Sequence, residues 1–136
     1  MGLALEDGIA IALTGDLGAG KTTFTQGLAL GLGVDPEFPV TSPTFNIINE
    51  YPGERFRLCH LDLYRLGDVE ELDYIGFEDL LGEQSVIAVE WPGLLMEDRF
   101  KFDLEIQFEF DPDYNRILTF FASGQRGVKV LSRIFS

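Results

Sequence analysis

Residues 9–32 read IAIALTGDLGAGKTTFTQGLALGL, and this stretch decides the fold. Its first part, Ile9–Leu13, is a short apolar run of the kind that forms a buried parallel strand. Its last part, Thr22–Leu32, carries apolar residues at four-residue spacing and is compatible with a helix. The middle part, Gly15–Thr22, matches the P-loop pattern of a glycine, four residues, and then Gly-Lys-Thr. A strand before this pattern and a helix after it are the context in which it predicts a nucleotide site.

The chemistry of phosphate binding accounts for these residue types. Glycines lack a Cβ, so the loop can turn sharply and direct backbone N–H groups at an anion, as does the start of the following helix. Lys21 is expected to reach the β- and γ-phosphates, and the Thr22 hydroxyl to hold Mg²⁺. The alternative, a glycine-rich turn with a chance lysine, is disfavoured by the flanking strand and helix. The residues predicted to contact the nucleotide are Gly15, Asp16, Gly18, Ala19, Gly20, Lys21, Thr22 and Thr23.

Two acidic residues stand at the ends of later predicted strands. Asp62 follows the run from Arg55, and Glu90 follows Val86–Val89, the cleanest buried strand in the sequence. Ligands bind at the C-terminal ends of strands in open α/β sheets, so each acid is a candidate for binding Mg²⁺ or for orienting the attacking water. Asp62 has the poorer strand, because Arg57 and His60 interrupt it. A packed structural role is favoured for His60, the only histidine.

Thr44 lies in a hydroxyl-rich segment after the first helix, where P-loop switch proteins keep a γ-phosphate sensor. It is predicted either to complete the Mg²⁺ shell or position water, or to belong to an ordinary turn. Trp91, which follows Glu90, is expected to close over the site, to anchor a partner or to pack in the core. Residues 68–75 and 77–81 are predicted as short helices.

The second half of the chain predicts an antiparallel hairpin. Residues 102–110 alternate apolar and polar, 111–115 form a turn, and 116–121 return as the partner strand. A helix is expected over 124–134. Together with the first half, this predicts an α/β fold: a P-loop NTPase-like, mostly parallel sheet flanked by helices, with an antiparallel hairpin near the C-terminus.

Composition narrows the function classes. The chain has 136 residues, which suggests one domain over 1–136, and 23 acidic against 10 basic residues give a formal charge of −13. Such a surface repels nucleic acid and suits either a basic protein partner or simple solubility. A single cysteine, Cys59, fits a reducing cytoplasm, and no apolar run is long enough to span a membrane.

Four separated motifs resemble those of the bacterial TsaE (YjeE) family, the small ATPase of the threonylcarbamoyladenosine tRNA-modification system. They are residues 15–24, 41–45 (TSPTF), 62–65 (DLYR) and 90–92 (EWP), in that order. The resemblance spans nearly the whole chain. Family members usually carry a strand and a helix before the P-loop strand, so that layer is expected to be missing here.

The resemblance implies a domain that binds ATP with Mg²⁺, hydrolyses it slowly, and works with the TsaB–TsaD pair that modifies the adenosine beside the anticodon. It implies metal-site roles for Thr22 and Glu90, nucleotide-sensing or catalytic roles for Asp62 and Thr44, and a nucleotide contact by Arg126. The tRNA would be met only through the complex. The alternatives are a GTP-type switch, a small-molecule kinase and a non-enzymatic nucleotide sensor; no Asn-Lys-x-Asp guanine motif is present.

Overall fold

The computed structural model describes residues 8–15, 20–41, 47–64, 84–97 and 100–134. Six strands form one sheet in the order β2-β3-β4-β1-β5-β6. The pairs β1–β4, β3–β4 and β1–β5 are parallel, whereas β2–β3 and β5–β6 are antiparallel. The predicted α/β class, with a mostly parallel sheet and a C-terminal antiparallel hairpin, is therefore confirmed. Its strands are β1 (Ile9–Gly15), β2 (Ile48–Pro52), β3 (Arg57–Asp62), β4 (Ser85–Glu90), β5 (Leu104–Phe110) and β6 (Arg116–Ala122).

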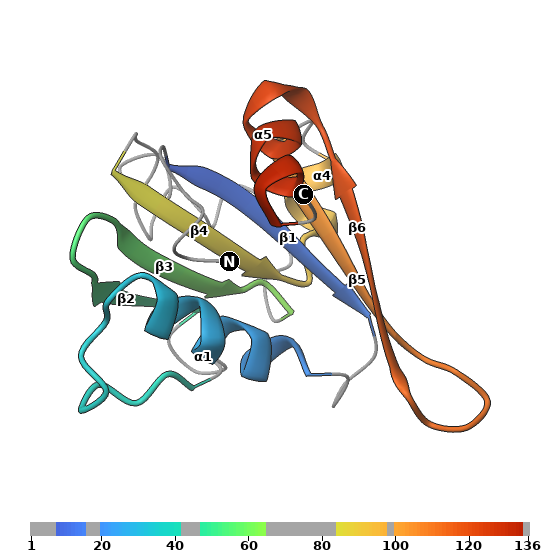
Figure 1. Ribbon diagram of the computed structural model, residues 1–136, viewed down its shortest axis with the longest axis horizontal. Helices are drawn as coiled ribbons and strands as arrows, with labels where there is room; N and C mark the ends of the chain where they lie inside the picture. Colours follow the sequence, from blue (N-terminus) through green and yellow to red (C-terminus); the bar gives the residue numbers. More distant parts are fainter. Residues whose placement is uncertain (1–7, 16–19, 42–46, 65–83, 98–99, 135–136) are drawn as a thin grey trace.

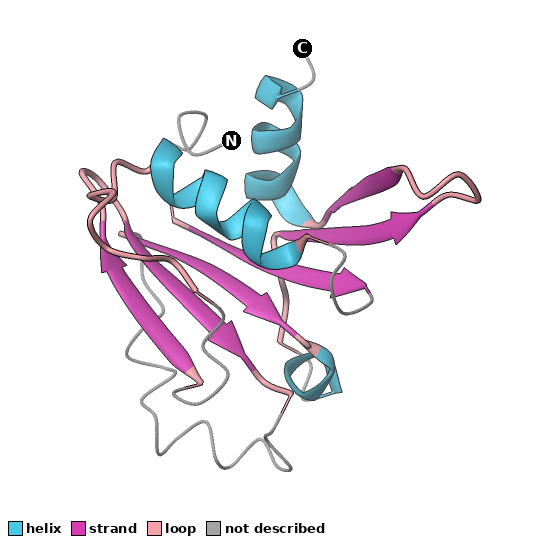
Figure 2. Ribbon diagram, turned by 90° about the horizontal axis from the view of Figure 1, so that it is seen from below, coloured by secondary structure: helices cyan, strands magenta, loops and turns pink. Residues whose placement is uncertain are grey.

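Helices cover both faces of the sheet. Helices α1 (Lys21–Gly31) and α5 (Gly124–Ile134) lie on one face, and the short α4 (Gly93–Glu97) lies on the other (Figure 2). Within the described residues, no helix is both long enough and apolar enough to cross a membrane. The predicted helices over 22–32 and 124–134 are confirmed, whereas α4 was not predicted. The expected helices over 68–75 and 77–81 lie outside the described residues.

The alternation of side chains along the central strands sorts the core into two layers. Ile11, Leu58 and Ala88 pack with Leu28 of α1 on one face, while Ala12 and Val89 pack with Leu95 of α4 on the other. Because side chains alternate, His60 and Asp62 share the face of Leu58, and Glu90 shares the face of Ala88. The polar residues of β3 and β4 therefore lie on the face that α1 covers. β3 is an interior strand despite its Arg57 and His60, since Leu58–Leu61 are all buried.

The hairpin β5–β6 extends beyond the rest of the sheet (Figure 1). Its register places Phe110 opposite Arg116, and Gly15 at the end of β1 opposite Phe108. Gly15 has a φ of 132°, and a Cβ there would lie 2.3 Å from the carbonyl oxygen of Phe108. Only glycine allows this conformation and this approach. The first glycine of the P-loop pattern thus fixes how closely β1 and β5 meet beneath the loop.

Cys59 is fully buried on the α4 face of the sheet, and burial raises the pKa of its thiol from 9.0 to about 11. Between these values the unfolded chain releases the thiol proton while the folded chain retains it. The free energy of unfolding should therefore fall as pH rises above 9, by about 2–3 kcal/mol at pH 11. The measurement is urea unfolding of wild type and Cys59→Ala from pH 8 to 11. The prediction would be contradicted if the free energies of unfolding of wild type and Cys59→Ala changed equally with pH over this range.

Candidate phosphate and metal site

The site forms at the edge of the sheet where the parallel strands end. β1 ends at Gly15, β3 at Asp62 and β4 at Glu90, and these strands are neighbours. Asp62 and Glu90 are direct register partners, so their Cα atoms are about 5 Å apart and their side chains leave the same face. The topology thus brings together two acids that are 28 residues apart in the sequence, next to the start of α1.

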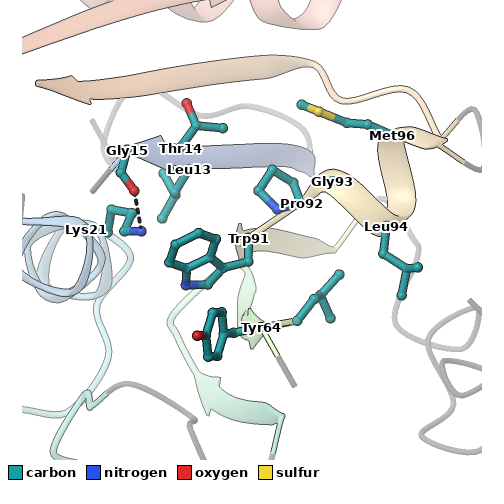
Figure 3. Close-up of a pocket in the computed structure, with 11 residues that line it drawn as sticks. Leu13, Thr14, Gly15, Lys21, Tyr64, Trp91, Pro92, Gly93, Leu94 and Met96 are labelled. Carbon is teal, nitrogen blue, oxygen red and sulfur yellow. Dashed lines mark hydrogen bonds between the residues drawn. The ribbon is translucent and has the colours of Figure 1, made fainter. Parts of the chain in front are cut away.

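Lys21 is the first residue of α1, and its side chain is almost completely buried, with 5% exposed. Its Nζ donates a hydrogen bond to the carbonyl oxygen of Gly15 (2.9 Å) and lies 4.4 Å from the centre of the Trp91 ring (Figure 3). Within the described residues no carboxylate lies within ion-pair distance of this ammonium group. A buried cation without an anionic partner is costly unless an anionic ligand compensates it. This arrangement therefore indicates an anion-binding site.

The beginning of α1 adds backbone donors to the same place. Its N-cap residue, Gly20, has a left-handed φ of 103° and supplies no side-chain cap. The N–H groups of the first turn are consequently not bonded to a capping side chain, and no acidic residue of that turn offsets the helix dipole. Thr22, in the same turn, is half-buried. The predicted contacts Asp16, Gly18 and Ala19 lie outside the described residues, whereas Thr23 is exposed.

A cavity of about 470 Å³ opens beside Lys21. Trp91 and Tyr64 line it with Leu13, and their rings contact each other at a centroid distance of 5.1 Å (Figure 3). Trp91 has a φ of 56°, a left-handed backbone that is unfavourable for a bulky residue and that is frequent at functional sites. Of the three roles considered for Trp91, its position over the lysine favours closure over the site.

Glu90 is buried, with 5% exposed, and its Oε2 lies 2.6 Å from Nε2 of His60, which is fully buried. An unpaired buried carboxylate would be costly, and the pairing of Glu90 with His60 removes that cost. Asp62 is half-buried, and its Oδ1 accepts a hydrogen bond from the N–H of Tyr64 (3.0 Å).

The other predicted residues are not brought to this edge by the described structure. Thr44 lies outside the described residues. Arg126 donates from Nη1 to the carbonyl oxygen of Gly8 (3.2 Å), at the opposite end of β1. The seven residues of β1 separate it from Gly15 by roughly 20 Å. The structure therefore does not group Arg126 with Lys21.

Arg116, the first residue of β6, is not among the residues predicted from the sequence. A Cβ on Gly20 would lie 3.3 Å from Nη1 of Arg116, so the guanidinium group lies against the N-cap of α1. Within the described residues, Arg116 forms no ion pair. Its position directly after the 111–115 turn was the available signal, but only the tertiary structure shows that this end of the hairpin lies beside the N-cap of α1.

Arg116→Ala should weaken the binding of a phosphate-bearing ligand at this site about tenfold, because an exposed guanidinium beside the N-cap of α1 contributes about 1–1.5 kcal/mol to an anion. Arg116→Lys should recover part of the lost affinity. Added salt should reduce the difference in affinity between wild type and Arg116→Ala. Titration calorimetry measures both effects. Lys129→Ala, an exposed cation on α5, is the matched control, and equal affinities for Arg116→Ala and this control would contradict the role.

A mostly parallel sheet, a helix that begins at a buried lysine after a glycine N-cap, and two strand-end acids define the class of P-loop NTPase-like α/β proteins. Comparison with known proteins is more specific. Residues 1–118 match the family model "Threonylcarbamoyl adenosine biosynthesis protein TsaE". The chain belongs to the TsaE family, as its resemblance predicted.

The relatives named "tRNA threonylcarbamoyladenosine biosynthesis protein TsaE" include one from Borreliella burgdorferi and one from Bacillus subtilis. The first is 44% identical over 93 residues, which is 68% of this chain and 66% of that protein. The second is 43% identical over 121 residues, which is 89% of this chain and 74% of that protein. The crystal structure of Bacillus subtilis YdiB matches with a TM-score of 0.74 and 35% identity, over 98% of this chain and 81% of that one.

Proposed function

We propose that this protein binds ATP with Mg²⁺ at the C-terminal edge of its sheet, hydrolyses it slowly, and thereby serves tRNA threonylcarbamoyladenosine biosynthesis in the cytoplasm. The observation that carries the proposal is the buried Lys21 ammonium at the capless N-terminus of α1. Membership of the TsaE family supplies the pathway. The TsaB–TsaD pair is the proposed partner, and contact with tRNA is proposed to occur only through that complex.

The donor set fits Mg²⁺. This ion prefers oxygen ligands and is usually held by one or two carboxylates together with substrate phosphates and waters. The Thr22 hydroxyl and the carboxylates of Asp62 and Glu90 are oxygen donors at one edge of the sheet. The described residues contain no group of three or more acids, histidines or cysteines that would hold a metal ion without a substrate. The site therefore suits an ion that arrives with a nucleotide.

Each residue has a defined part in the proposed reaction. Lys21 exchanges its contact with the Gly15 carbonyl for the β- and γ-phosphate oxygens, and the N–H groups of α1 orient the same phosphates. Bound Mg²⁺ neutralises charge on the phosphate oxygens. Glu90 or Asp62 orients a water for in-line attack on the γ-phosphorus and accepts its proton. As the new P–O bond forms, the bond from the γ-phosphorus to the β–γ bridging oxygen breaks and ADP leaves. Trp91 and Tyr64 shield the lysine from bulk water.

The proposal is tested by phosphate release from Mg·ATP and Mg·GTP, by the chain alone and with the TsaB–TsaD pair. We expect slow release from ATP alone and a clear increase with the pair, because a partner can supply stabilising charge to the transition state. Free phosphate, rather than a phosphorylated small molecule, is the expected product. Equal rates with and without the pair, or a preference for GTP, would contradict the proposal.

A further inference from the structure

The fully buried His60 carries an arrangement that no role above explains. Its Nε2 lies 2.6 Å from Oε2 of Glu90, whereas its Nδ1 is buried and has no hydrogen-bond partner among the described residues. His60 and Glu90 come from the neighbouring strands β3 and β4 and share the face that α1 covers. A histidine placed in this way can affect the site only through the carboxylate.

The unpartnered Nδ1 shows where the proton lies. An orphaned buried N–H is rarer in proteins than an under-satisfied acceptor, so a bare Nδ1 is the less costly state. In that state Nε2 carries a proton and donates it to Oε2 of Glu90. The short distance of 2.6 Å fits a hydrogen bond to an ionised carboxylate.

This hydrogen bond occupies one oxygen of the Glu90 carboxylate, Oε2, and leaves the other, Oε1, able to bind a ligand. Within the described residues, Oε1 of Glu90 accepts no hydrogen bond. Outer partners that hold a ligating carboxylate in one orientation commonly change metal affinity 10- to 100-fold when removed. We infer that His60, through Nε2–H, is a positioning residue that fixes the Glu90 carboxylate with Oε1 presented to the Mg²⁺ of a bound nucleotide. The identity of the bound ion rests on the proposed function, whereas the tautomer of His60 does not.

The first test needs no nucleotide. His60 is the only histidine in the sequence, so a long-range ¹H–¹⁵N spectrum of the tag-free protein shows a single imidazole. We expect the Nε2–H tautomer in wild type. A ring without a proton on Nε2 would overturn the inference, whatever the protein does with ATP.

The second test measures Mn²⁺, as a probe for Mg²⁺, by its electron paramagnetic resonance in the presence of ADP. His60→Met removes the donor and should raise the Mn²⁺ dissociation constant about tenfold, whereas His60→Gln, which keeps a donor, should stay within about threefold of wild type. In a Glu90→Gln background, His60→Met should add no further loss in Mn²⁺ affinity. This double variant also avoids leaving a buried carboxylate unpaired, so it remains informative where His60→Met alone unfolds.

The outcomes separate the two proposals. Wild type that binds no Mn²⁺ with ADP would refute the proposed function. Two outcomes would refute the positioning role alone. In the first, wild type and His60→Met bind Mn²⁺ with equal affinity. In the second, His60→Met lowers the Mn²⁺ affinity as much in the Glu90→Gln background as it does in wild type. Loss in His60→Met, recovery in His60→Gln and no loss in the double variant would support it.

Discussion

Lys21→Ala is expected to weaken ATP binding about 100-fold and to reduce hydrolysis to background. Removing one partner of a buried, hydrogen-bonded charge pair costs about 2–5 kcal/mol, and each 1.4 kcal/mol is a factor of ten in affinity. In the ligand-free protein the ammonium is buried over Trp91 without an acidic partner among the described residues. Its removal should therefore leave the thermal midpoint of unfolding unchanged or raised. Titration calorimetry and differential scanning calorimetry measure the two effects.

Lys101→Ala is the matched control, because Lys101 is exposed and lies outside the cavity that Lys21 lines. It should bind ATP as wild type does. A Lys21→Ala protein that keeps its affinity within about threefold would remove the main support for a phosphate site. Loss of affinity together with a collapse of the thermal midpoint would show instead that Lys21 acts on folding.

Glu90→Gln is expected to lower the rate of hydrolysis about 100-fold or more while the protein still binds nucleotide. A positioned acid or base typically contributes 10²–10⁴-fold to a reaction, and an amide can neither accept the proton of water nor offer a charged ligand to Mg²⁺. The amide oxygen can still accept the hydrogen bond from His60, so the fold should be retained. Steady-state phosphate release gives the rate, and calorimetry with ADP gives the affinity.

Comparison with Asp62→Asn assigns the two acids. The variant that loses hydrolysis and also needs more Mg²⁺ for half-maximal nucleotide binding has lost a metal ligand; the variant that loses only hydrolysis has lost the residue that orients water. Glu37→Gln, an exposed acid in the loop after α1, is the control. Unchanged turnover in both Glu90→Gln and Asp62→Asn would refute the proposed chemistry of the strand-end acids.

Much of the fold could be predicted because local patterns agreed with the tertiary structure. The apolar run at Ile9, the buried run at Val86 and the alternation over 102–110 all form strands at or near the expected bounds. β3 was harder to predict, because a polar residue such as His60 is uncommon in a buried strand. Its pairing with Glu90, 30 residues away, satisfies the histidine, and no local pattern contains that information.

The sequence by itself predicted a phosphate-binding turn, because glycine spacing, a lysine and a helix start act within a dozen neighbouring residues. It also determined the family, through four short motifs, and the acids that follow two strands. Only the tertiary structure decided that Asp62 and Glu90 lie side by side and that Trp91 covers Lys21. It also decided that His60 contacts Glu90, and that Arg116 rather than Arg126 lies against the N-cap of α1. These contacts depend on strand order and register, which bring together residues that are far apart in the chain. The periodicity of side chains predicts which face of a strand is buried, but it does not predict which strands become neighbours.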